Sequence, residues 1–166
     1  MVDGDDAQNL LYLEDLSVGQ RFISATHALD EQQIKAFAAQ FDPQPFHLDD
    51  RAASASLFGG LAASGWHTAA ITMRLLVGGG LPIAGGIIGA GGEVSWPRPA
   101  RPGDVLRVES EVVAVRPSRS RPERGMVAVR SETLNAKGEI VQSLVANLVV
   151  PRRGAKNRAA EEAGPL

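Results

Sequence analysis

The sequence contains no cysteine, one tyrosine among its few aromatic residues, and almost no net charge. Without cysteine the chain has no disulfide, no cysteine-ligated zinc and no thiol nucleophile, which suits a protein of the reducing cytoplasm. The 17 Lys and Arg nearly balance the 19 Asp and Glu, giving a net charge of -2. This balance argues against nucleic acid as a partner, because phosphate binding needs a surplus of basic side chains.

Signals for membrane insertion are also lacking. The first ten residues, MVDGDDAQNL, have neither the basic start nor the apolar run of a secretory signal. Residues 75–92 are uncharged, which is close to the length of a membrane span. Many of them are Gly, however, and Pro82 lies in the middle, so the stretch is poor in helix formers. We expect no membrane span there, but a helix end, a loop and a Gly-rich strand.

The composition is that of a globular chain with its own core, at 44% hydrophobic and 22% charged residues over 166 positions. The polar ends, residues 1–10 and 153–166, are expected to be flexible tails. This leaves one domain over residues 11–152.

The first half of the domain predicts a strand and two helices. Residues 21–29 read as a strand, and Asp30 is a suitable N-cap for a helix ending near Phe41. Pro43 and Pro45 are expected to end that helix and to force an extended, irregular stretch to residue 63, with a short helical turn at 50–57. The next helix, at 65–77, is apolar on most faces, which is typical of a buried helix.

The second half reads as strands with alternating apolar residues, at 87–96, 105–115, 126–134 and 140–150. Short links between the last three favour an antiparallel meander. A helix that is apolar on most sides must be widely covered, and a curved antiparallel sheet wrapped round it does so. The pattern therefore predicts an α+β protein with a hot-dog fold.

Chemistry concentrates between the two helices. Asp42 and His47 lie five residues apart on a segment stiffened by proline, and a carboxylate with an imidazole can share the proton transfers of acid–base catalysis. Gly65 follows the N-cap candidate Ser64, and the free amides of a helix start can stabilise an oxyanion. The alternative reading makes Asp42 a helix cap and His47 a buried, hydrogen-bonded side chain.

This stretch resembles the signature of the MaoC-like dehydratases, the (R)-specific enoyl-CoA hydratases. Their motif reads roughly Gly-Asp-x-Asn-Pro-x-His-x-Asp, followed by an aromatic residue and by a Gly that opens the central helix. The matching residues are Asp42, Pro45, His47, Asp49, Phe58 and Gly65. Phe41 and Gln44 depart from it, since the family commonly has Gly and Asn there. The resemblance covers about residues 11–152, including the turn at 101–104.

The resemblance implies a hydro-lyase that adds water across a 2-enoyl-CoA thioester. Asp42 and His47 would be the acid–base pair, and the amide of Gly65 the oxyanion donor. The substrate contacts that we expect are Phe58, Ser64, Trp66, Arg98 and Arg101. Coenzyme A is part of the substrate, so no cofactor and no metal are expected. The family pairs its protomers edge to edge, which implies a homodimer or a larger homo-oligomer.

Two other functions stay open. Thioesterases of the same fold place an acidic residue on or near the central helix, but residues 65–77 contain no Asp or Glu. A non-catalytic acyl-thioester-binding module is the other, and the departures at Phe41 and Gln44 leave it open. A metal site of Asp42, His47 and His67 is disfavoured, because it lacks the i, i+4 pair of helical zinc sites. His67 is expected to be a packing residue.

Overall fold

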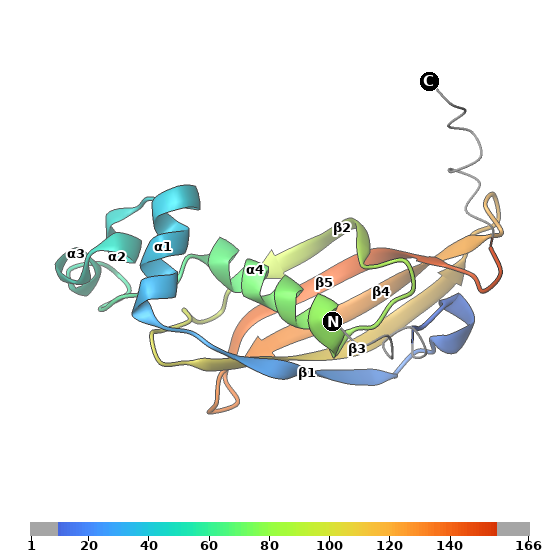
Figure 1. Cartoon of the computed structure of the whole chain (residues 1–166), viewed down its shortest axis with the longest axis horizontal. Coiled ribbons are helices and arrows are strands. Elements are labelled where there is room, and N and C mark those ends of the chain that lie inside the picture. The colour runs from blue at the N-terminus through green and yellow to red at the C-terminus, as the bar shows by residue number, and fades with distance from the viewer. Residues whose placement is uncertain (1–9, 156–166) are drawn as a thin grey trace, which may run out of the picture.

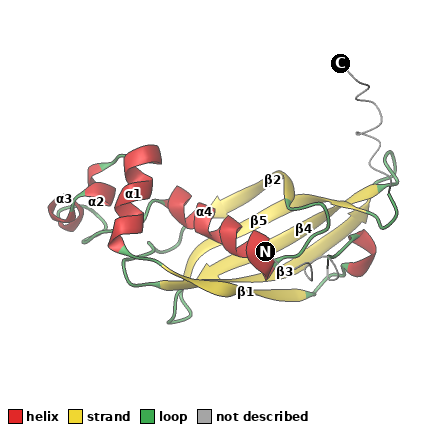
Figure 2. Cartoon of the chain, in the orientation of Figure 1, coloured by secondary structure: helices red, strands yellow, loops and turns green. Residues whose placement is uncertain are grey.

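A five-stranded antiparallel sheet with one long helix across its face forms the body of the protein, as the computed structural model shows for residues 10–155 (Figures 1 and 2). The sheet order is β1-β3-β4-β5-β2. The strands are β1 (Arg21–Ala28), β2 (Ile88–Ser95), β3 (Val105–Pro117), β4 (Arg124–Leu134) and β5 (Ile140–Pro151). The predicted hot-dog arrangement and the β3–β4–β5 meander are confirmed. The predicted tails lie almost wholly outside the described residues, so the domain limits stay a prediction.

The central helix α4 (Gly65–Leu75) crosses the sheet and continues into a π-helical turn, η3 (Leu76–Gly80) (Figure 1). Ile71 and Leu75 are buried against inward-facing strand residues such as Val129. The predicted central helix is confirmed, but it is buried on one face only, because the sheet of one chain covers that face alone. The opposite face carries three exposed apolar side chains, from Trp66, Met73 and Val77.

Three further helices form a cluster beyond the sheet, near the start of α4: α1 (Glu31–Phe41), α2 (Pro45–Leu48) and α3 (Asp50–Ser54) (Figure 1). Asp30 caps α1 as predicted, with its carboxylate accepting from the amide of Gln33 at 2.8 Å. The prediction of an extended stretch after Pro43 is wrong at Pro45, where a short helix begins. Pro45 is the first residue of α2, a position where proline's missing N–H costs nothing. His47 therefore lies on a helical turn and not in a loop.

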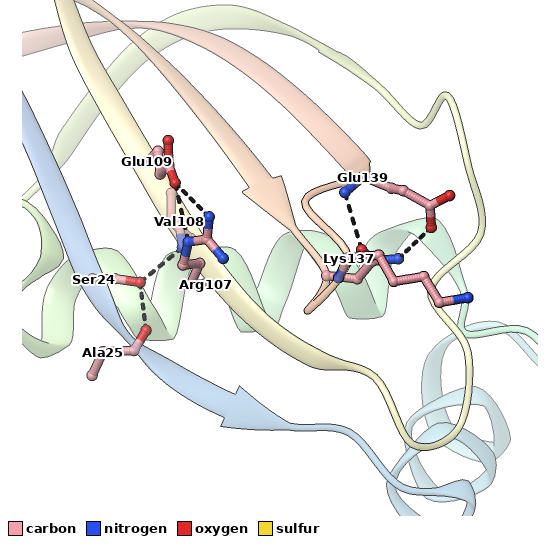
Figure 3. A network of polar contacts seen from close by, with 8 residues as sticks. Ser24, Ala25, Arg107, Val108, Glu109, Lys137 and Glu139 are labelled. Carbon is pink, nitrogen blue, oxygen red and sulfur yellow. Dashed lines mark hydrogen bonds and ion pairs between the residues drawn. The ribbon is translucent and has the colours of Figure 1, made fainter.

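Strand β1 contains a bulge that fits it under the end of the central helix (Figure 3). Between Ile23 and Thr26 the pairing with β3 shifts, and the amide of Val108 donates to the hydroxyl of Ser24 at 2.8 Å instead of to a strand carbonyl. That hydroxyl donates in turn to the carbonyl of Ala25. Gly80, at the end of η3, lies so close that a Cβ on it would be 2.7 Å from the Cβ of Ser24.

The turn predicted between β4 and β5 is confirmed (Figure 3). The side-chain oxygen of Asn135 accepts from the amides of Lys137 and Glu139, both at 3.0 Å, and Gly138 has a φ of +78°. Such a side-chain turn fixes the register of the two strands. No helix within residues 10–155 is long and apolar enough to cross a membrane.

Candidate active site

Asp42 and His47 meet where the helical cluster joins the body of the protein. Asp42 is the C-cap of α1, and His47 lies on α2. The Asp42 Oδ2 and His47 Nε2 atoms are 3.4 Å apart, and only 3% of His47 is exposed. The turn that begins at Pro45 brings the imidazole back beside the carboxylate. The two residues predicted as the acid–base pair are thus neighbours in space as well as in sequence.

The hydrogen bonds of His47 show which ring nitrogen carries the proton. Its Nδ1 lies 2.7 Å from the carbonyl oxygen of Ala62. A carbonyl oxygen only accepts, so Nδ1 donates, and in the neutral ring Nε2 then presents a lone pair to Asp42. An ionised carboxylate is also only an acceptor. Two acceptors therefore face each other, and a molecule with two hydrogens to donate, such as water, satisfies both.

The surroundings of Asp42 favour its ionised form. Partial burial acts to raise the pKa of this carboxyl, but hydrogen bonding by Ser64 and Gln44, together with the charge of His47 when its ring is protonated, outweighs it, so the pKa is lower than that of an ordinary Asp. The amide of Gln44 donates to Asp42 Oδ1 at 2.7 Å. Gln44, where the family commonly has Asn, thus supports the carboxylate directly.

The start of α4 lies at the same site. The Ser64 hydroxyl caps the helix by accepting from the amide of Trp66 at 3.2 Å. Gly65 is the first residue of the helix, and amides in a first turn have no intrahelical partner. The indole of Trp96 packs directly on Gly65, since a Cβ there would lie 2.7 Å from two of its ring atoms. Only glycine leaves room for this contact.

A cavity of about 230 Å³ joins these groups. Its lining residues are His47, Phe58, Ala63, Gly65, Thr68, Trp96, Arg98, Pro99 and Ala100. The Phe58 ring lies 5.8 Å from the His47 ring, and Phe46 packs edge-on against His47 at 4.6 Å. The cavity therefore has an apolar wall beside the imidazole, and a basic side chain, Arg98, at its rim.

The remaining predicted substrate contacts lie in different surroundings. Arg98 is exposed at the cavity, whereas the guanidinium of Arg101 donates to the carbonyls of Phe58, Gly60 and Leu61. Arg101 thereby holds the loop that carries Phe58. Trp66 is 61% exposed, and its ring packs edge-on against Trp96 at 5.3 Å. Neither Arg101 nor Trp66 lines the cavity, and their contacts with substrate stay predictions.

His67 lies apart from the acid–base pair. Its ring stacks on Phe37 with centroids 4.6 Å apart, and Nδ1 is buried without a hydrogen-bond partner. Burial, aided by the charge of His27, lowers the pKa of His67 below its ordinary value, so the ring is neutral. Within residues 10–155 no group of three His, Asp or Glu side chains could hold a metal ion.

Sequence reasoning missed three parts of the site. The carbonyl of Ala62, which orients His47, is backbone and leaves no signal in a sequence. Gln44 was visible only as a departure from the family motif. Trp96 stood at the end of a Gly-rich strand, and a large aromatic residue in such surroundings was a signal that could have been used.

Comparisons with known proteins show which proteins this chain is similar to. The chain is 66% identical in sequence to the MaoC-like dehydratase from Rhodospirillum rubrum, whose crystal structure is known. The two structures superpose with a TM-score of 0.85, over 86% of this chain and 98% of that one. The R-hydratase PhaJ1 from Pseudomonas aeruginosa is 29% identical, with a TM-score of 0.67 over 86% of each chain. The 3-hydroxybutyryl-CoA dehydratase of Methylorubrum extorquens is 29% identical over 95% of this chain and 90% of that protein.

The family resemblance is confirmed by a sequence model of the family, described as the MaoC like domain, which matches residues 16–135. This match spans both Asp42 and Gly65, and it covers well over half of the chain. The protein therefore belongs to the MaoC-like dehydratase family.

Proposed function

We propose that this protein is an (R)-specific 2-enoyl-CoA hydratase, which also runs in reverse as a 3-hydroxyacyl-CoA dehydratase. The observation that carries the proposal is the pair of acceptors that face each other, Asp42 Oδ2 and His47 Nε2 at 3.4 Å. A water donating to both would have its oxygen lone pair free to attack C3 of an enoyl thioester. The R-hydratase and the 3-hydroxybutyryl-CoA dehydratase named above support this class of substrate.

The proposed reaction needs no group beyond these residues and water. His47 Nε2 takes a proton from the water as its oxygen bonds to C3, and the C2=C3 electron pair moves toward the thioester. The imidazolium that forms is stabilised by the Asp42 carboxylate, whose low pKa keeps it charged. The pair then delivers a proton to C2. The net change is addition of water across the double bond, and the pair returns to its starting state.

The negative charge that develops on the thioester oxygen needs a donor. The amide of Gly65 belongs to the first turn of α4, where free N–H groups and the positive end of the helix dipole coincide. Removing one such donor typically costs about 2.7–4 kcal/mol of barrier in enzymes with an oxyanion hole. Phe58, Ser64 and Trp66 would line the route of the substrate, with Arg98 and Arg101 near the coenzyme A phosphates.

Hydrolysis of the thioester is the competing chemistry. Thioesterases of this fold usually place an acidic base on or near the central helix, and α4 (Gly65–Leu75) itself contains no Asp or Glu. Purified protein mixed with 2-butenoyl-CoA separates the functions. Loss of the enoyl absorbance without release of free thiol supports hydration, thiol release means hydrolysis, and binding with neither change means a binding module. Oxidation of the product by an (R)-specific 3-hydroxyacyl-CoA dehydrogenase, and not by an (S)-specific one, tests the stereochemistry.

The proposed enzyme works as a homodimer or a larger homo-oligomer. All eight residues of the edge strand β2 are exposed, and so are the apolar side chains of Trp66, Met73 and Val77 on the adjacent face of α4. An unpaired edge beside an apolar stripe favours pairing with a second copy. Light scattering after size-exclusion chromatography should give a mass at least twice that of the 17.5 kDa chain. A monomer at micromolar concentration would contradict this.

A further inference from the structure

A second cavity lies between the end of the central helix and strands β2, β4 and β5. It has a volume of about 290 Å³ and is almost wholly apolar. Its lining residues are Met73, Leu76, Leu81, Ile87, Gly89, Gly91, Gly92, Val94, Val129, Ser131, Leu144, Ala146 and Leu148. The catalytic cavity is lined by the beginning of α4, at Gly65 and Thr68, and this one by its end. The two cavities follow one another along the helix.

A line of hydrogen-bonded side chains crosses the cleft between the two cavities. Trp96, just after β2, donates its indole N–H to the side-chain oxygen of Gln142 on β5 at 2.8 Å. The amide of Gln142 donates to the Thr72 hydroxyl on α4 at 3.0 Å. On α4, Thr72 lies between Thr68, which lines the catalytic cavity, and Leu76, which lines the apolar one.

Every hydrogen-bonding group in this line is satisfied, so its orientation is fixed. The indole N–H can only donate, which sets the side-chain oxygen of Gln142 toward Trp96 and its amide toward Thr72. The Thr72 hydroxyl donates to the carbonyl of Thr68 at 2.9 Å and accepts from Gln142 and from Thr133, whose hydroxyl is 2.6 Å away. Gln142 and Thr133 are wholly buried. The indole N–H of Trp96 is thus bonded to the buried Gln142, and the face of its ring packs on Gly65.

We infer that Trp96 is a fixed partition that confines the acyl group to the catalytic cavity and so restricts the enzyme to short-chain 2-enoyl thioesters, with Gln142 as its positioning residue. This inference rests on the proposed function. In this proposal the indole, which lines the catalytic cavity, keeps a longer chain from reaching the apolar cavity beyond Thr72 and Gln142. Swinging or removing the indole would join the two cavities.

The test compares 2-butenoyl-CoA with 2-octenoyl-CoA. Where a pocket has no room, one methylene changes kcat/KM by about 10–200-fold, so the unaltered protein should prefer the butenoyl substrate by at least about tenfold. Trp96→Ala should shift this ratio toward octenoyl-CoA by about tenfold or more, chiefly by lowering the KM for the long substrate. Gln142→Leu, which frees the indole, should shift the ratio in the same direction by less. Leu57→Ala, a fully exposed control, should leave the ratio unchanged.

Binding of saturated thioesters separates failure of the partition from failure of the proposed function. Calorimetry with butyryl-CoA and octanoyl-CoA should show that only Trp96→Ala and Gln142→Leu gain affinity for the longer ligand, whether or not turnover occurs. An unaltered protein that handles both lengths equally, or a Trp96→Ala variant that weakens both by the same factor, overturns the partition. Failure of the unaltered protein to bind either butyryl-CoA or octanoyl-CoA would also overturn the partition. If the binding shift occurs without any hydration, the partition stands and the proposed chemistry falls.

Discussion

Two largely buried polar clusters lie about α4, and they differ in how fully their hydrogen bonds are satisfied. In the cluster of Thr72, Thr133, Gln142 and Trp96, every side-chain polar atom has a hydrogen-bond partner, and the groups hold one another in place. In the pair of Asp42 and His47, the neutral imidazole and the carboxylate face each other as two acceptors. A completed network fixes structure, whereas an incomplete one, supported from behind, is prepared to hold a reacting molecule.

The largest effect is expected from a substitution that lets residue 42 hydrogen-bond directly to His47. Asp42→Asn turns one acceptor partly into a donor, which can satisfy His47 Nε2 directly and removes the charge that stabilises the imidazolium. Hydration of 2-butenoyl-CoA should fall by about 10²–10⁴-fold, the usual contribution of acid–base catalysis. Stopped assays with purified variants measure the loss. Asp30→Asn is the matched control, because Asn caps a helix as well as Asp does, and it should keep full activity. Equal activity in both variants would exclude Asp42 from the chemistry.

Removing one hydroxyl from the satisfied cluster around Gln142 should lower the free energy of unfolding. Thr72→Val keeps the side chain's shape but leaves the Gln142 amide and the Thr133 hydroxyl without their partner inside the core. A buried polar group without a partner costs about 1–3 kcal/mol, so the free energy of unfolding in urea should fall by at least that amount. Thr26→Val, on the exposed part of β1, should change it by less than about 0.5 kcal/mol. Similar values for the two variants would show that the network adds nothing.

A smaller effect concerns the pH dependence of the incomplete pair. Gln44→Leu removes the amide that donates to Asp42 Oδ1 and so should raise the pKa of Asp42 toward its ordinary value. Because the reaction needs the ionised carboxylate, the acid side of the kcat/KM profile should move to higher pH. Gln32→Leu, an exposed change on α1, should leave the profile in place. A profile unmoved by Gln44→Leu would mean that ionisation of Asp42 does not limit the rate.

The smallest effect is expected at His67, which belongs to neither cluster. Its pKa is lowered by burial and by His27, so the unfolded chain binds a proton more readily than the folded one. Stability should therefore fall as the pH drops below the ordinary pKa of histidine, about 6.5. His67→Phe, which keeps the stack on Phe37, should flatten this fall in urea titrations at pH 7.5 and 5. An equal slope in both proteins would assign the pH dependence to other groups.

The contrast between the clusters also explains what the sequence could predict. Asp42 and His47 are close in the chain, so spacing and proline content placed them together, and Ser64 was recognisable as a helix cap. Trp96 and Gln142 are 46 residues apart, and only the register of β2 with β5 brings them together. The bare face of α4 was missed because periodicity counts apolar residues and cannot show which of them the sheet covers. The α2 turn was missed because Pro45 was taken to break a helix, although it begins one.

The three consecutive glycines at the end of the central helix should differ in how well they tolerate substitution. Gly78 has an ordinary φ of -75° and open space where a side chain would be, so alanine should be accepted there. Gly79 also has space, but its φ of +109° strains any other residue. A Cβ on Gly80 would lie 2.7 Å from the Cβ of Ser24 and from the carbonyl oxygen of Leu75, which forbids even a methyl group unless this backbone moves. Over generations these three neighbouring positions should drift at different rates, with Gly78 free to change long before Gly80.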